Sequence, residues 1–295
     1  IENQRSKLSS HDANPTFAMG DSIHLYVYNR HPLGAKLSSE DLDKVDYDKI
    51  LAIHKSLFDN MGQFAFNIIG DFDTDSIIPL VCRYIASLPA GNRKLEPHDI
   101  GYRYAQGEQS HIFSMPMTTP QTISYTFYNA PCEYNAANIV LAHATGSILQ
   151  GKLRDDLREA RGWTYGVKSH CGLSAGMNGN DPARAIIPVY IRVEPQNADS
   201  CYAIVKATAT AMATPGFVTP DEVTKVKQYL EKSWQDNGRS NDYWHTVLKM
   251  RHKFGQDLHT SFPDHIRTLT PERVAEFAKD VILPASRLHL EMTPL

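Results

Sequence analysis

The stretch from 135 to 161 constrains the fold of this chain more than any other part of the sequence. Its apolar and small residues recur at three- and four-residue steps, at Ala142, Gly146, Leu149, Leu153 and Leu157. That period predicts one amphipathic helix whose small residues allow close approach to a sheet. Gly162 is suited to a left-handed helix stop, and residues 163–171 then have the composition of a strand. The sequence therefore indicates a helix packed on a sheet.

The corner that ends this helix carries Arg158 and Tyr165, seven residues apart. A guanidinium is a forked donor and a phenol is a single donor, so both could bind the same carbonyl or carboxylate, which suggests peptide recognition. A structural interpretation is also open. In it, Arg158 is a solvated helix end beside the negative pole of the helix dipole, and Tyr165 is an ordinary strand aromatic.

The residues around this corner, Leu-Arg-Glu-x-x-Gly-x-Thr-Tyr-Gly-Val at 157–167, resemble a corner in the C-terminal halves of insulinase and pitrilysin zinc peptidases. These are the inverted zincins, whose metal motif is His-x-x-Glu-His. A second block, 64–89, resembles the strand, Gly-Asp-Phe-Asp turn, helix and Leu-Pro stop of the same peptidases. The resemblance implies repeated αβ-roll domains. It also implies that Arg158 and Tyr165 hold the backbone of a peptide substrate, so we take both as candidate substrate-binding residues.

Metal-binding residues are not predicted in this chain. None of the thirteen histidines begins His-x-x-Glu-His or His-Glu-x-x-His. His245, His252 and His259 are spaced by seven residues, but Gly255 interrupts the helix that would align them, and this spacing makes a poor chelate. We expect no catalytic residue and no metal ligand here. The resemblance places the zinc in an upstream half of the full-length protein.

Composition excludes several other classes of function. The chain has 295 residues, 42% hydrophobic and 21% charged, with a net charge of −3, so it has no basic surface typical of nucleic-acid binding. No apolar run approaches the roughly 20 residues that cross a bilayer. The four cysteines are too scattered to suggest a disulfide framework or a metal site. No phosphate-binding glycine motif and no Gly-x-Ser-x-Gly nucleophile motif occurs.

The predicted fold class is α+β, with αβ-roll domains and a mostly antiparallel sheet covered by helices on one face. Residues 1–92 are expected to form the latter half of one αβ-roll domain, 93–108 a linker, and 109–295 a complete C-terminal domain. In the first segment we expect strands at 22–29 and 64–70 and helices at 39–59, bent near Val45, and at 73–88.

In the C-terminal domain, residues 110–116 and 121–129 are expected to form a hairpin. Further strands are expected at 163–171, 185–194 and 286–292. Additional helices are expected at 197–213, 220–238, 242–253 and 271–281. The helix at 220 begins with a threonine cap, a proline and acidic residues, which is typical of a helix start.

Together these features predict the C-terminal, non-zinc-binding part of a zinc metalloendopeptidase. Its expected partners are a peptide or unfolded protein substrate and an upstream catalytic half, and this segment alone is expected to be inactive. The alternative is a noncatalytic peptide-binding or scaffold subunit of the same family. Because the first domain is unfinished, we also expect a free sheet edge that could support a homodimer or another contact.

Overall fold

The computed structural model of the chain describes residues 2–11, 14–91, 96, 98–176 and 181–295. Its N-terminal segment contains α1 (Glu2–His11), α2 (Pro15–Val27), α3 (Ser39–Asp43), α4 (Tyr47–Phe58) and α5 (Thr74–Tyr84). The strands that follow are β1 (Glu108–Met115), β2 (Thr122–Pro131), β3 (Val167–Ser169), β4 (Gly172–Ser174), β5 (Arg184–Val193) and β6 (Ser286–Pro294). The remaining α-helices are α6 (Ala136–Arg154), α7 (Ala198–Ala211), α8 (Pro220–Asn237), α9 (Asn241–Phe254), α10 (Phe262–Arg267) and α11 (Pro271–Ile282).

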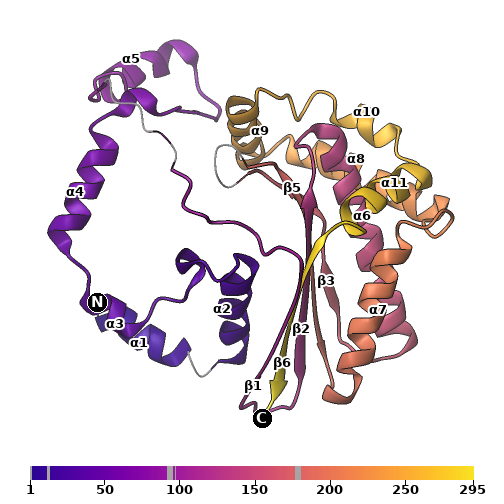
Figure 1. Cartoon of the computed structure of the whole chain (residues 1–295). Coiled ribbons are helices and arrows are strands. Elements are labelled where there is room, and N and C mark those ends of the chain that lie inside the picture. The colour runs from indigo at the N-terminus through magenta and orange to yellow at the C-terminus, as the bar shows by residue number, and fades with distance from the viewer. Residues whose placement is uncertain (1, 12–13, 92–95, 97, 177–180) are drawn as a thin grey trace.

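The described strands form one six-stranded sheet in the order β1-β6-β2-β5-β3, with β4 also paired to β5. All pairs are antiparallel except β1 with β6, which run parallel from Glu108 opposite Arg287 to Met115 opposite Pro294. Helices α6, α7 and α11 cover one face, and α8 and α10 pack outside α6 (Figure 1). The predicted α+β class, a mostly antiparallel sheet with helices on one face, is confirmed.

The predicted hairpin between residues 110–116 and 121–129 is wrong in its pairing. Both segments are strands, but β6 lies between them and bonds to each. The local composition of β1 and β2 resembles that of a hairpin because the same β-branched and aromatic residues suit any strand pair. The strand inserted between them comes from the far end of the chain.

The predicted strand at 22–29 is also wrong, because most of it belongs to helix α2. Met19, Ile23 and Val27 recur at four-residue steps, and Met19 and Val27 are buried against β2 and β6 on the face opposite α6. The Asn14 side chain accepts a hydrogen bond from the Thr16 amide, and Pro15 occupies the first helical turn. These signals for a helix start favour a helix here over the strand that the alternating pattern at 22–29 predicts.

The segment around α4 and α5 differs most from its expected packing. The break between α3 and α4 lies at the predicted bend, but neither α4 nor α5 buries any residue. Residues 64–69 are extended without assignment to a strand. The alternating side chains of Phe64, Phe66 and Ile68 are all exposed by more than 40%. The described molecule therefore presents an apolar surface along this segment, where a core strand was expected.

Helix α8 begins with the capping box that its sequence indicates. The Thr219 hydroxyl accepts from the Glu222 amide, and the Glu222 carboxylate accepts from the Thr219 amide at 2.8 Å and pairs with Lys152 on α6 at 2.9 Å. Partial burial alone would raise the pKa of Glu222, but the bonds from Lys152 and Thr219 outweigh it and hold this pKa below its usual 4.5. The carboxylate therefore stabilises the folded state in its charged form.

Replacing Glu222 with alanine is expected to lower the free energy of unfolding by about 1–2 kcal/mol at neutral pH. Because the folded-state pKa is lowered, this stabilisation is present above pH 4.5 and is lost as the pH falls toward the folded pKa. Urea denaturation of both proteins across this range checks the sign. Asp221→Ala is the matched control, because Asp221 pairs with Lys225 and both side chains are exposed, so its effect should stay below about 0.5 kcal/mol.

Candidate functional site

The predicted corner forms where α6 ends. The last turn is a π-helix at Asp155–Ala160, and Leu157 within it is fully buried. Gly162 adopts a φ of 65°, so its amide turns back to the Arg158 carbonyl at 3.0 Å, and the Trp163 amide reaches the Leu157 carbonyl at 2.9 Å. The left-handed helix stop is therefore confirmed at Gly162. Buried Leu157 fixes this turn to the core and leaves its neighbour Arg158 facing outward.

The structure brings the two predicted substrate-binding residues together. The Arg158 Cζ atom lies 5.6 Å from the centre of the Tyr165 ring. Tyr165 is 93% exposed and the Arg158 side chain 47% exposed. Within the described residues, neither side chain donates a hydrogen bond to another group, and the Arg158 Nε atom is 3.6 Å from Glu159. Both donors are therefore available to a ligand that reaches this corner.

Two further side chains of the corner, Trp163 and Thr164, have structural contacts. Thr164 is buried, and its hydroxyl both donates to the Gly166 carbonyl at 3.0 Å and accepts from the Gly166 amide at 3.2 Å. Trp163 packs against the core, and the Arg161 guanidinium lies over its ring. These contacts brace the loop that carries Tyr165. The Arg161 guanidinium is also bound to Asp156 at 2.6 Å, so it is less available to a ligand than that of Arg158.

The described residues do not fit a zinc ion. Among residues 2–11, 14–91, 96, 98–176 and 181–295, no three His, Cys, Asp or Glu side chains come close enough to hold a metal. Gly255 ends α9 with a φ of 69°, so His259 lies outside the helix that carries His245 and His252. The His259 ring instead meets the Tyr243 hydroxyl at 2.8 Å and stacks on Trp234. The three histidines therefore do not share one helical face, and they form no metal-binding group among the described residues.

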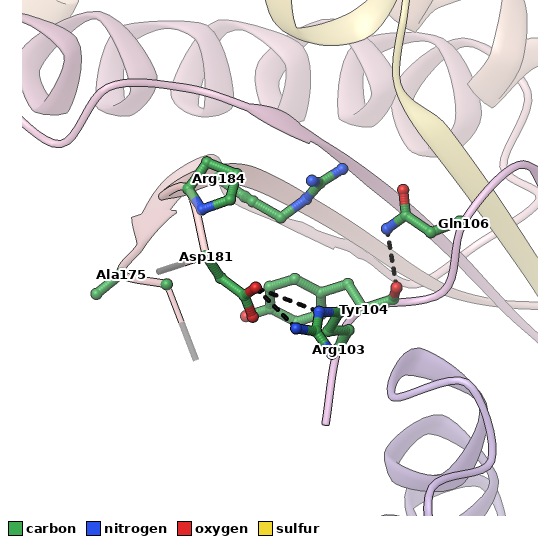
Figure 2. A pocket seen from close by; sticks show the side chains of 8 residues that line it. Arg103, Tyr104, Gln106, Ala175, Asp181 and Arg184 are labelled. Carbon is green, nitrogen blue, oxygen red and sulfur yellow. Dashed lines mark hydrogen bonds and ion pairs between the residues drawn. The ribbon is translucent and has the colours of Figure 1, made fainter. Parts of the chain in front are cut away.

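A small pocket lies where the segment before β1 meets the sheet. Figure 2 shows the Arg103 guanidinium against Asp181, and Arg103 also pairs with Asp99. The Tyr104 side chain is buried, and its hydroxyl donates to the Ser174 hydroxyl at 2.9 Å. The volume is about 50 Å³, which holds roughly one or two water molecules. The contacts around this pocket attach the end of the predicted linker to the sheet. The pocket itself is too small for a peptide substrate.

A row of open cavities beside α6 was not predicted from the sequence. They are lined by outward-facing residues of this helix, His143, Ser147 and Gln150, together with residues of α8 and the β3–β4 turn. A signal for them existed in the polar residues at three- and four-residue steps on the helix.

The fold of the chain is shared with several solved structures. The periplasmic protease PqqL from Escherichia coli matches with a TM-score of 0.81 and 17% identity, over 100% of this chain and 32% of its own. A peptidase M16 inactive domain from Pseudomonas fluorescens matches with a TM-score of 0.75 and 17% identity, over 100% and 69%. A chain of Complex III2 from Candida albicans matches with a TM-score of 0.70 and 13% identity, over 99% and 70%. At these identities the similarity shows the fold alone.

The family follows from the sequence. The model of the Peptidase M16 inactive domain matches residues 44–230, which is more than half of the chain, and the chain therefore belongs to this family. The predicted resemblance is confirmed at that level. No curated protein sequence matches the chain. The chain spans about one third of the length of PqqL. No helix of the described residues has the length and apolar character needed to cross a membrane.

Proposed function

We propose that this chain is the non-zinc-binding part of a zinc metalloendopeptidase. In this role it binds a peptide or unfolded protein and orients it for hydrolysis in an upstream, metal-bearing half. The observation that carries the proposal is the corner itself. The Arg158 guanidinium lies 5.6 Å from the Tyr165 ring, and both side chains stay open to solvent above a buried base.

The chemistry assigned to this chain is orientation. The Arg158 guanidinium can donate two parallel hydrogen bonds to carbonyl oxygens of an extended peptide, and the Tyr165 hydroxyl can donate one more. Fixing several backbone carbonyls removes the translational and rotational freedom of the scissile bond before the reaction. The zinc of the upstream half would supply an activated water.

The proposed contact with an upstream half has support in the N-terminal segment. Large apolar side chains from Val45 to Tyr84 are exposed, and α4 and α5 bury no residue. Apolar surface of this kind usually marks an interface. We propose that the upstream half of the same domain covers this surface. A homodimer through the extended residues 64–69 is the second arrangement, and sedimentation of the chain alone distinguishes a dimer from a monomer.

The alternative function is a noncatalytic peptide-binding or scaffold subunit of the same family. It is favoured by the similarity of fold to a chain of Candida albicans Complex III2, which is a component of a larger assembly. In that role the chain would bind its partner through the same apolar segment. The open donors of Arg158 and Tyr165 favour peptide handling over a purely structural role.

Cleavage of a fluorogenic peptide tests the main proposal. The 295-residue chain alone is expected to be inactive with or without zinc. A longer protein that also includes the upstream half is expected to cleave the peptide, and chelation of zinc should abolish this activity. Zinc-dependent cleavage by the chain alone would contradict our assignment of its role. Inactivity of both proteins would favour the scaffold subunit.

A further inference from the structure

The outward face of α6 forms the floor of a groove that leads away from the corner. Ile139, His143, Ser147 and Gln150 recur at three- and four-residue steps, and none of the four is among the buried residues of this helix. One wall of the groove is α8. The other wall is the turn that connects β3, which lies at the edge of the sheet, to β4.

Three cavities join along this floor. The first, of about 400 Å³, shares His143 and Tyr229 with the second, of about 520 Å³. The second shares Ser147 and Gln150 with the third, of about 250 Å³, which reaches Arg154 and Asp155. Because each cavity shares lining residues with the next, they form one continuous path. We call this path the α6 groove.

The length of the α6 groove suits an extended peptide. A helix rises about 1.5 Å per residue, so the path from Ile139 to Arg158 is roughly 28 Å long. An extended chain rises about 3.3 Å per residue, so roughly eight residues of peptide cover this distance. The groove therefore ends within one helical turn of the corner that presents Arg158 and Tyr165.

The far end of the groove is aromatic and carries no acidic or basic side chain other than His143. The first cavity, which we call the aromatic cavity, is lined by rings from the residues just before α6, from α8 and α9, and from α10, namely Tyr134, Tyr229, Trp234, Tyr243 and Phe262. The Tyr243 hydroxyl meets His259 at 2.8 Å, and Trp234 and His259 are stacked with ring centres 5.1 Å apart. These contacts hold the walls in place before a ligand arrives. An aromatic or large aliphatic side chain fits such a lining.

The middle of the groove is polar and suits a peptide backbone. Within the described residues, the buried Ser169 hydroxyl has no hydrogen-bond partner, and the Gln150 side chain already accepts from the Ser169 amide at 2.9 Å. Partial desolvation and the nearby His170 lower the pKa of His143 from its usual 6.5, so this ring is neutral at neutral pH. Neutral polar groups favour the amides of a peptide over a charged ligand.

We propose that an extended peptide substrate follows the α6 groove from the corner to the aromatic cavity. There it buries an aromatic or large aliphatic side chain about eight residues from the backbone that Arg158 and Tyr165 hold. This inference rests on the proposed peptide-binding function and adds the class of side chain that the substrate carries.

Photo-cross-linking to the 295-residue chain tests the groove directly. The probes are fluorescein-labelled peptides of about twelve residues, which is long enough to cover the groove. The peptides differ only in the position at which p-benzoylphenylalanine replaces an alanine. Mass spectrometry locates each cross-link. We expect one position to react with α8 or α9 at the aromatic cavity, and a position about eight residues away to react near Tyr165.

Ser147→Trp places a large side chain on the floor of the groove, where Ser147 is exposed. It should weaken peptide binding at least tenfold and abolish the cross-link to the aromatic cavity. Tyr229→Ala removes an exposed wall and should reduce the same cross-link without disturbing the core. Ser200→Trp, at an exposed position on α7 outside the groove, is the matched control and should change neither result.

The outcomes separate this inference from the function on which it rests. If binding depends on Arg158 but is unchanged by Ser147→Trp and Tyr229→Ala, the corner binds peptide and the groove does not. If no peptide binds saturably, peptide binding by this chain fails and the groove fails with it. Cross-links to α8 and α9 that Ser147→Trp removes would support both.

Discussion

Replacing Gly146 with alanine is expected to lower the free energy of unfolding by about 3 kcal/mol. A methyl group at this position of α6 would lie 2.1 Å from the Cys171 amide nitrogen and 2.7 Å from the His170 carbonyl carbon. Both atoms belong to backbone, which cannot rotate away as a side chain would. Alanine is the better helix former by about 1 kcal/mol, so the cost of separating the helix from the turn must exceed that gain.

Gly151 provides a matched control on the same helix. A methyl group there meets no atom within 4 Å, so Gly151→Ala should be neutral or stabilise the protein by up to about 1 kcal/mol. Chemical denaturation followed by circular dichroism measures both variants. Equal stabilities for the two would contradict the close approach between α6 and the turn that follows β3.

Loss of the Arg158 side chain is expected to reduce kcat/KM for peptide cleavage by about 100-fold, measured in a protein that includes the upstream half. Removing a charged donor from a backbone carbonyl costs about 1.5–3 kcal/mol, or roughly 10- to 150-fold in kcat/KM, and the two bonds that Arg158 can donate place the expected loss near the upper end. Tyr165→Phe removes one neutral donor and should cost about tenfold. The stability of both variants should change little, because both side chains are largely exposed.

Arg161→Ala is the control for charge at this corner. The Arg161 guanidinium is bound to Asp156 at 2.6 Å and lies over Trp163, so its removal should leave kcat/KM within about threefold of the parent protein. Arg158→Lys keeps the charge but loses the forked geometry, and it should fall between the parent and Arg158→Ala. A loss of activity in Arg161→Ala as large as that in Arg158→Ala would show that net charge, rather than the position of Arg158, is responsible.

Local features of the sequence predicted the corner well. The position where α6 ends depends on signals that span only a few residues: the helical period of apolar residues, a glycine suited to positive φ and polar residues at the helix ends. The outward position of Arg158 follows from the same short-range rules. The cap at Thr219 was predicted for the same reason. These start and stop signals need no knowledge of distant parts of the chain.

Long-range features could not be predicted in the same way. The pairing of β1 with β6 joins residues about 180 positions apart, and no local pattern in either strand indicates the other. The row of cavities beside α6 depends on where α8 and the β3–β4 turn lie. From the sequence alone, the polar residues of α6 therefore cannot be distinguished from an ordinary solvated helix face. The extended residues 64–69 have a strand pattern, but no strand pairing is assigned to them in the described chain.

The position of β6 has a consequence for the order in which the protein can mature during synthesis. This strand leaves the ribosome after the other described strands of the sheet, yet it occupies an inner place between β1 and β2. Until it emerges, both neighbours expose unpaired backbone that can associate with other nascent chains. A chain that stops before β6 would therefore have a divided sheet rather than a shortened edge, because β1 and β2 are joined only through this strand among the described residues.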